Sequence, residues 1–253
     1  MVEFAEYATG VPCWVDVTST ELERSVAFYA ALFGWEAETS PQPEAGGYTM
    51  FRLRGKYVAA ASPPPPGSPA ASYWTTYLAS DDVDLTAAKV REAGGTVLME
   101  PFDVFEAGRM TVAQDPAGAS FGVWQAGRHV GAQLANEPGT LSWNECHSPD
   151  PEQAAAFYAA AFGYTIETAE MGGPAPYRLL QVDGRAVAGL AETRERERPN
   201  WMTIFAVADC DAAAAQAAEL GGSVVAEPFD IPTVGRFAVL RDPVGAGFGV
   251  LAG

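Results

Sequence analysis

Hydrophobic and polar residues alternate over some short stretches of this chain and recur every three or four positions over others. Residues 12–18 alternate, which predicts a strand with Trp14 and Asp16 on one face and Val15 and Val17 on the other. The first predicted strand therefore presents an aromatic and an acidic side chain to the same side of a sheet.

A helix is predicted directly after this strand. Apolar residues recur at spacings of three and four between Leu22 and Phe33, hydroxyl side chains at 18–20 offer N-caps, and Gly34 ends the pattern. Further strands are predicted at 35–39, 48–53 and 57–61. This order of one strand, one helix and three strands defines a βαβββ module.

A second module of the same order follows. Residues 63–69 are rich in proline and predict an extended surface connector. The elements predicted after it are a strand at 73–79, a helix at 83–93 and strands at 96–99, 110–114 and 121–125. The last two strands are joined by a turn at Asp115-Pro116-Ala117-Gly118, with proline and glycine where a tight turn accepts them.

The whole pattern then occurs a second time. Glu100–Val123 recurs as Glu227–Val250 at a constant spacing of 127 residues, and self-similarity at a fixed period identifies homologous units. We predict an α+β fold of two tandem domains, 1–130 and 131–253, each a pair of βαβββ modules forming a half-barrel cavity. Each domain is expected to fold separately, and the charged run at 192–198 is expected to be a solvated connector.

Charge and composition exclude several classes of partner. The formal net charge is -17, from 32 acidic and 15 basic residues, so a nucleic acid or an anionic membrane surface would be repelled. No apolar run is long enough to span a bilayer, and no signal peptide is recognised. Three cysteines without metal-site spacing indicate reduced thiols in a cytoplasmic protein. A monomer or a homodimer is expected.

The repeated motifs resemble those of the vicinal oxygen chelate superfamily, which contains glyoxalase I, extradiol dioxygenases and bleomycin-resistance proteins. The resemblance covers essentially the whole chain, and it is nearest to tandem, glyoxalase-like actinobacterial proteins often labelled hydroxylase, including those of anthracycline gene clusters. It rests on Phe28-Tyr29, Phe33-Gly34, Gly94-Gly95, Gly108-Arg109 and Asp115-Pro116 with their second copies. In catalytic members, a His or Gln on the first strand of each module and a Glu on the last strand hold a divalent metal.

This chain departs from that metal-binding pattern. The resemblance places four tryptophans, Trp14, Trp74, Trp143 and Trp201, at the first-strand positions, and Gly122 and Gly249 at the last-strand positions. Divalent metals need several N, O or S ligands that converge on one point. We therefore predict no metal and no cofactor. The two glycines are interpreted as openings through which a planar ligand could enter.

Strand alternation then predicts which side chains line the cavities. Indoles that face each other across a concave sheet would form a stacking site for a flat apolar ligand, and one acid in each half could pair with an amine on it. The predicted ligand-binding residues are Trp14, Asp16, Trp74, Thr76, Trp124, Trp143, Glu145, Trp201, Thr203 and Phe205. His147 and the neighbouring Glu145 are candidates for acid–base catalysis. Two surface ion pairs are also expected, Arg109–Asp103 and Arg236–Asp230.

The hypothesis favoured by these features is metal-independent binding of a hydrophobic, aromatic and preferably cationic small molecule. Such binding would serve antibiotic sequestration, self-resistance or a biosynthetic enzyme. Two alternatives stay open from the sequence. One is an enzyme of the glyoxalase-like superfamily, such as a lyase, an isomerase or a hydroxylase-like protein. The other is an interaction protein whose cavities are filled by its own tryptophans, because large aromatic residues usually belong to the core.

Overall fold

The computed structural model describes residues 3–67, 70–169, 176–193 and 198–253. In the first half the elements are β1 (Pro12–Thr18), α1 (Leu22–Phe33), β2 (Glu36–Thr39), the 3-10 turn η1 (Pro43–Ala45), β3 (Thr49–Leu53), β4 (Lys56–Ser62), β5 (Tyr73–Ala79), α2 (Val83–Glu92), β6 (Thr96–Val104), β7 (Gly108–Gln114) and β8 (Ser120–Ala126). In the second half they are β9 (Leu141–Ser148), α3 (Pro151–Phe162), β10 (Thr165–Ala169), β11 (Tyr177–Val182), β12 (Arg185–Glu192), β13 (Asn200–Ala206), α4 (Cys210–Glu219), β14 (Ser223–Ile231), β15 (Gly235–Arg241) and β16 (Gly247–Ala252).

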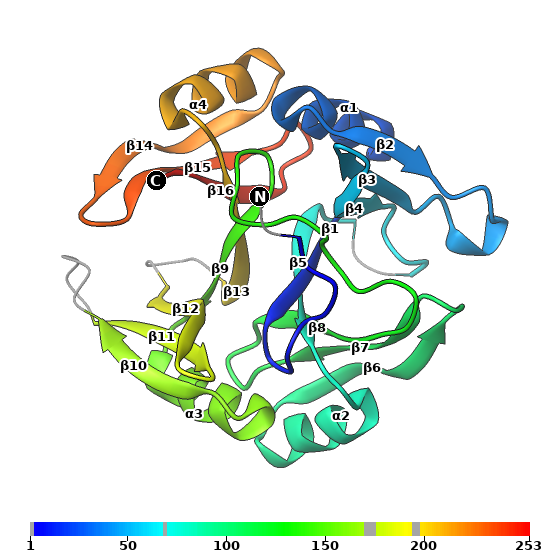
Figure 1. Cartoon of the computed structure of the whole chain (residues 1–253), viewed down its shortest axis with the longest axis vertical. Coiled ribbons are helices and arrows are strands. Elements are labelled where there is room, and N and C mark those ends of the chain that lie inside the picture. The colour runs from blue at the N-terminus through cyan, green and yellow to red at the C-terminus, as the bar shows by residue number, and fades with distance from the viewer. Residues whose placement is uncertain (1–2, 68–69, 170–175, 194–197) are drawn as a thin grey trace.

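Each half folds into one eight-stranded mixed sheet. The strand order is β2-β3-β4-β1-β5-β8-β7-β6 in the first half and β10-β11-β12-β9-β13-β16-β15-β14 in the second. The two modules of a half join where β1 pairs antiparallel with β5, and β9 with β13. Figure 1 shows the central strands of the two sheets next to each other in the middle of the molecule, with α1 and α4 at one end and α2 and α3 at the other. The predicted α+β fold of two tandem domains is confirmed.

The local sequence signals explain most element boundaries. Gly34 adopts the left-handed conformation that ends α1, and the Asp82 side chain caps α2 by accepting from the backbone N–H of Leu85. The expected hydroxyl N-cap of α1 is absent, because Glu21 holds the cap position without a side-chain hydrogen bond. Strand β6 runs on to Val104, beyond the predicted end at residue 99.

The hydrophobic cores of the molecule cross between the halves. One core joins β1, β3 and α1 of the first half to α4 and β16 of the second, with Tyr29 packed near Phe248. The other joins α2 and β8 to α3 and β12, with Phe121 packed near Tyr158. Each helix layer therefore contains one helix from each half, which argues against the expectation that the halves fold separately.

Several of the repeated motifs form this contact between the halves. A Cβ added to Gly95 would lie 2.7 Å from Phe157, and one added to Gly222 would lie 3.0 Å from Phe28. The second glycine of each Gly-Gly pair thus gives room to the phenylalanine of the other half. These positions repeat because the same contact is made twice around a pseudo-twofold axis.

A tryptophan–tyrosine–aspartate chain also crosses between the halves. Trp201 Nε1 donates to the Tyr158 hydroxyl at 2.8 Å, and that hydroxyl donates to Oδ2 of Asp115 at 3.3 Å. Asp115 also holds its own turn, because its Oδ1 accepts from the backbone N–H groups of residues 117–119. The predicted turn role of Asp115 is confirmed, and its contact with the second half is an addition.

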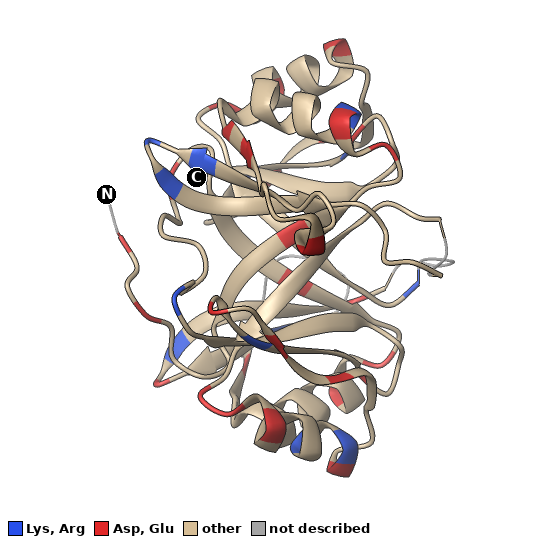
Figure 2. Ribbon diagram, turned by 90° about the vertical axis from the view of Figure 1, so that its right-hand side faces the viewer, with Lys and Arg blue, Asp and Glu red and all other residues tan. Residues whose placement is uncertain are grey.

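The surface carries the predicted ion pairs and a spread of acidic groups. Arg109 pairs with Asp103 at 3.0 Å as predicted, and it also forms a bidentate ion pair with Asp84. Arg236 pairs in the same way with Asp230 and Asp211. Figure 2 shows acidic segments over the helices and loops with a few basic ones between them. Of the predicted connectors, residues 68–69 and 194–197 lie outside the described residues.

Candidate functional site

The concave face of the first sheet carries a hydrogen-bonded cluster of Trp14, Asp16, Tyr48 and Tyr77. Trp14 and Asp16 alternate on β1, as predicted. The hydroxyls of Tyr48 and Tyr77 both donate to Oδ2 of Asp16, at 3.1 and 2.9 Å. Trp14 Nε1 donates to the Tyr48 hydroxyl at 3.0 Å. The four side chains therefore form one network that ends on a buried carboxyl group.

The second sheet repeats this cluster with one partner exchanged. Trp143 Nε1 donates to the Tyr177 hydroxyl at 2.9 Å, and that hydroxyl donates to Oε2 of Glu145 at 2.5 Å. His147 Nε2 lies 2.6 Å from Oε1 of Glu145. Ile204 stands opposite Trp143, where Tyr77 stands opposite Trp14 in the first sheet. In the second sheet the His147 imidazole therefore contacts the carboxyl group in place of the phenol that Tyr77 supplies in the first sheet.

Glycines on neighbouring strands give room to the aromatic rings of these clusters. A Cβ on Gly122 would lie 2.1 Å from the Tyr77 ring, and one on Gly189 would lie 1.7 Å from the Tyr177 hydroxyl. A Cβ on Gly249 would lie 2.7 Å from Phe237. The interpretation of Gly122 and Gly249 as entry points for a ligand is wrong, because side chains of the protein itself fill both positions.

Trp74 and Thr76, two further predicted residues of the first half, lie on the opposite face of the sheet. In the antiparallel pairing of β1 with β5, Trp74 stands opposite Val17, whereas Tyr77 stands opposite Trp14. Directly opposed residues share a face, so Trp74 points toward the helices. Its Nε1 donates to the Tyr29 hydroxyl at 2.9 Å in the core. Thr76, also on this face, donates to Asn144 of the second half at 2.8 Å.

The same register holds in the second half. Trp201 stands opposite Cys146 and Thr203 opposite Asn144, so both side chains belong to the core face of β13. Phe205 is fully buried in the core that contains α1. The two predicted tryptophans of a half therefore do not face each other across a cavity, and the expected pair of stacked indoles is wrong.

A cavity of about 460 Å³ opens above the Asp16 cluster. Asp16, Tyr48 and Tyr77 form part of its floor, and the walls are mostly apolar, with Met110 and Val112 from β7. Trp74 and three residues of the second half, Pro199, Asn200 and Trp201, also line it. Tyr73, Leu98 and Met99 at its lining are 44%, 50% and 43% exposed, so large apolar side chains border it on the solvent side.

Burial sets the charge state of Asp16. Desolvation raises the pKa of its carboxyl group to about 6, although hydrogen bonds from Tyr77, Tyr48 and Thr75 oppose that rise. The folded pKa lies above the ordinary value of 3.8, so ionising Asp16 costs folding free energy as the pH rises through about 6. Burial, together with the nearby Asp16 charge, raises the pKa of both Tyr48 and Tyr77 well above its ordinary value. The phenols therefore act as hydrogen-bond donors.

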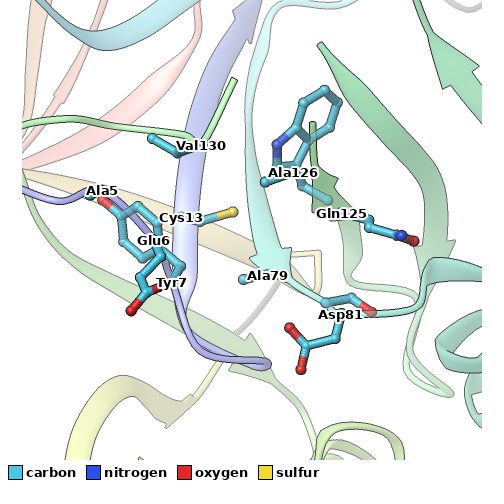
Figure 3. A pocket seen from close by; sticks show the side chains of 11 residues that line it. Ala5, Glu6, Tyr7, Cys13, Ala79, Asp81, Gln125, Ala126 and Val130 are labelled. Carbon is cyan, nitrogen blue, oxygen red and sulfur yellow. The ribbon is translucent and has the colours of Figure 1, made fainter. Parts of the chain in front are cut away.

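A smaller cavity of about 280 Å³ lies beside the start of β1, and residues 5–7 of the N-terminal segment form part of its lining. Figure 3 shows Tyr7, Cys13 and Val130 around it. Trp124, predicted for the first cavity, lines this smaller one and donates from Nε1 to the carbonyl of His129 at 2.9 Å. The His129 ring packs edge-on against Trp14 at 4.5 Å, and burial lowers its pKa to about 4. His129 is therefore a neutral side chain packed against Trp14 and Trp124.

Comparison with known proteins agrees with this architecture. Residues 13–123 match the family model described as "Glyoxalase/Bleomycin resistance protein/Dioxygenase superfamily", and residues 144–251 match a "Glyoxalase-like domain". Two such domains, each with a half-barrel sheet, define a tandem protein of the vicinal oxygen chelate class. The chain belongs to the glyoxalase, bleomycin-resistance and dioxygenase superfamily, as its motifs indicated.

Relatives are similar over nearly the whole chain. The chain is 48% identical to "Putative glyoxylase CFP32" of Mycobacterium tuberculosis (strain CDC 1551 / Oshkosh), covering 99% of this chain and 98% of that protein. It is 41% identical to "Anthracycline biosynthesis protein DauV" of Streptomyces sp. (strain C5), covering 97% and 94%. The crystal structure of the 2,3-dioxygenase LapB from Pseudomonas sp. KL28 superposes with a TM-score of 0.69 at 14% identity, covering 98% and 94%. That likeness shows the fold alone.

The residues at the superfamily's metal position do not fit a divalent ion. The first half offers one carboxyl group, two phenols and an indole N–H, which can only donate a hydrogen bond. In the second half Glu145 and His147 are engaged with each other. Across the described residues, His, Cys, Asp and Glu side chains form no group of three that could hold a metal ion. Such ions need several converging ligands, so a metal has too few donors at either position.

None of the helices in the described part of the chain has both the length and the apolar character needed to cross a bilayer. The longest helices, α1 and α3, have 12 residues each, against about 20 for a membrane span.

Sequence reasoning missed the two phenols that complete the Asp16 cluster. Tyr48 and Tyr177 recur at equivalent places in the two halves, and that recurrence was the available signal for their shared role. Tyr77 had no such signal, because Ile204 stands at its place in the second half. Its position in the cluster follows only from the β1–β5 register.

Proposed function

We propose that the first half binds a flat, largely apolar aromatic molecule in the 460 Å³ cavity above Asp16. The cavity itself is the observation that carries this proposal. Its volume lies within the range of about 300–1,000 Å³ found for small-molecule sites, and its lining combines apolar walls with a few polar groups at one end. Exposed apolar residues at its border offer a ligand surface to contact on entry.

The Asp16 carboxyl group gives the ligand a preferred orientation and charge. At neutral pH it is ionised, since burial raises its pKa only to about 6. A cationic or hydrogen-bond-donating group of the ligand would therefore lie toward Asp16, and the aromatic body would lie along Met110 and Val112. Burying roughly 200 Å² of ligand surface contributes about 5 kcal/mol. Association costs offset part of that gain, so we expect micromolar affinity.

The biological setting follows from the relatives. One of them is named for anthracycline biosynthesis, and anthracyclines are flat, polycyclic and aromatic. We propose that this chain serves antibiotic sequestration, self-resistance or a natural-product biosynthetic enzyme, and that its binding needs no metal. Glu145 and Trp143 offer a second, differently shaped polar cluster, and a role for it in binding is part of the same proposal.

A pair of matched variants tests the location of the site. Val112→Trp places an indole inside the cavity, whereas Val239→Trp makes the same change at the equivalent position of the second half. Titration calorimetry with 9-aminoacridine should give saturable binding to the wild type. Val112→Trp should weaken it at least about tenfold, or 1.4 kcal/mol, and Val239→Trp should change it little. Unsaturable heats for the wild type, or equal losses in both variants, would contradict the proposal.

A further inference from the structure

The Asp16 cluster has the composition of a proton-transfer site as well as a binding site. Asp16, a residue that is 5% exposed, borders a largely apolar cavity, and two hydroxyl groups donate to its Oδ2. Asp115, a buried acid with a structural role, accepts three backbone N–H groups of its own turn, whereas the hydrogen bonds to Asp16 come from side-chain hydroxyls. The groups that face Asp16 are neutral: Tyr48 beside β3, Thr75 and Tyr77 on β5, and Ala60 opposite it on β4.

We propose that Asp16 is a general base that moves a proton on an aromatic carbonyl compound bound in this cavity. The inference rests on the proposed function, because it requires the same cavity to hold the substrate. The reacting group is a C–H bond next to a carbonyl. The phenols of Tyr48 and Tyr77 are the donors for the oxygen of that carbonyl.

The step balances without a co-reactant. The Asp16 carboxylate takes the proton from the carbon, the C–H electron pair forms the C=C bond of an enolate, and the carbonyl oxygen takes the negative charge. As Asp16 becomes neutral, its hold on the two phenols weakens, and their O–H groups can donate to the new oxyanion. The carboxylic acid then returns the proton to the same or another carbon, so the net reaction is an exchange or an isomerisation.

The second half lacks this arrangement, which makes it an internal comparison. Both oxygens of Glu145 are engaged, Oε1 with His147 and Oε2 with Tyr177. Asp16 accepts hydrogen bonds from two phenols and from Thr75, so about one of the four lone-pair sites of its carboxylate is left for a ligand. Its partners are neutral hydroxyls, whereas Glu145 is paired with His147. The chemistry is assigned to the first half.

The charge state of Asp16 suits a base at physiological pH. A general base works best when its pKa lies near the working pH, and burial raises the pKa of Asp16 to about 6. Only the ionised carboxylate can accept a proton. Activity should therefore rise with pH through a midpoint of about 6 and level off above it.

Deuterium exchange into 2-tetralone tests the inference. The protein and this probe are mixed in buffered D₂O, and loss of the α-proton signal is followed by NMR with the buffer rate subtracted. We expect the wild type to exceed the buffer rate, and Asp16→Asn to lower the protein-dependent rate by about 100-fold or more, which is the usual contribution of a general base. Tyr77→Phe should lower it at least about tenfold, because one oxyanion donor is lost.

The control is Asp183→Asn, the same chemical change on an exposed turn whose φ of 50° asparagine tolerates well. Its exchange rate should equal that of the wild type. Binding of 2-tetralone is measured on the same samples by calorimetry. Saturable binding with exchange at the buffer rate overturns the base and leaves the proposed function standing. If the protein binds neither 2-tetralone nor 9-aminoacridine, the assignment of the base and the proposed function are both overturned. Full exchange by Asp16→Asn, or a rate that does not change with pH, also overturns the base.

Discussion

Thr76 and Thr203 occupy equivalent places in the two repeats, but their hydroxyls have different surroundings. Both side chains are fully buried. Thr76 Oγ1 donates to Asn144 Oδ1 at 2.8 Å, whereas Thr203 Oγ1 has no hydrogen-bond partner among the described residues. The residue of the first half equivalent to Asn144 is Val15, which cannot accept a hydrogen bond. A buried hydroxyl left unpaired costs about 1–3 kcal/mol.

Valine substitutions at these two positions should have opposite effects. Thr203→Val removes an unpaired hydroxyl and keeps the shape of the side chain, so we expect the free energy of unfolding to rise by about 1 kcal/mol. Thr76→Val leaves the Asn144 amide oxygen without its donor, so we expect a loss of about 1–3 kcal/mol. Urea unfolding of both variants, analysed with a common m value, measures the two changes in the free energy of unfolding. Changes of the same sign would contradict this account of the interface.

At the level of single residues, the sequence predicted part of the candidate site. Alternation along β1 correctly placed Trp14 and Asp16 on one face, and the face of Trp143, Glu145 and His147 followed in the same way. Alternation shows which residues of one strand share a face. It does not show which residues of the neighbouring strand share that face, because this depends on the β1–β5 register. For that reason the prediction for Trp74 was wrong.

At the level of elements, small residues on one strand decide where the aromatic rings of the next strand lie. Gly122 on β8 stands beside Tyr77 on β5 in a parallel pair, and the Tyr77 ring covers the place that a side chain at 122 would take. Gly189 on β12 does the same for Tyr177. The position of each phenol, and with it the hydrogen bond to Asp16 or Glu145, therefore depends on a neighbouring glycine.

Gly122→Ala should consequently disturb both stability and the site. The added Cβ would lie 2.1 Å from the Tyr77 ring, so the ring or the strand must move, at a cost of roughly 1–3 kcal/mol. For a chain of this size, each kcal/mol lowers Tm by about 2–4 °C. Ligand affinity should fall as well, because Tyr77 no longer holds Asp16. The control is Gly247→Ala on β16, where the nearest atom is 3.9 Å away. Equal effects of the two substitutions would contradict this explanation.

The fold was more predictable from the sequence than the site. Helix ends such as Gly34 and Asp82 carry local signals, and the repeat alone gave the module order. The strand predicted at 96–99 continues through Pro101 and Phe102 as β6. Proline is tolerated there because β6 is an edge strand, where a missing N–H breaks no ladder. No local pattern reports which helix packs beside which, so the pairing of α1 with α4 could not be read from the sequence.

At the level of the whole molecule, the two halves are joined by shared cores. Tyr29 of α1 packs against Phe248 of β16, and Phe121 of β8 packs against Tyr158 of α3. Further links are the hydrogen bond from Trp35 Nε1 to the carbonyl of Gly139 at 2.7 Å and the contact of Asp115 with Tyr158. A half on its own would expose the apolar faces of its helices and of its central strands.

Separating the halves should therefore abolish independent folding. We expect residues 1–130 alone to show no cooperative unfolding transition as a monomer, because part of the hydrophobic burial that stabilises α1 and α2 comes from the other half. Mixing this fragment with residues 131–253 should restore a 1:1 complex with the circular dichroism and the cooperative urea transition of the intact chain. The repeat also allows a fragment to pair with a second copy of itself, since equivalent residues form both sides of the contact. Sedimentation velocity separates these cases, and a monomeric, cooperatively folded fragment 1–130 would show that the shared cores are dispensable.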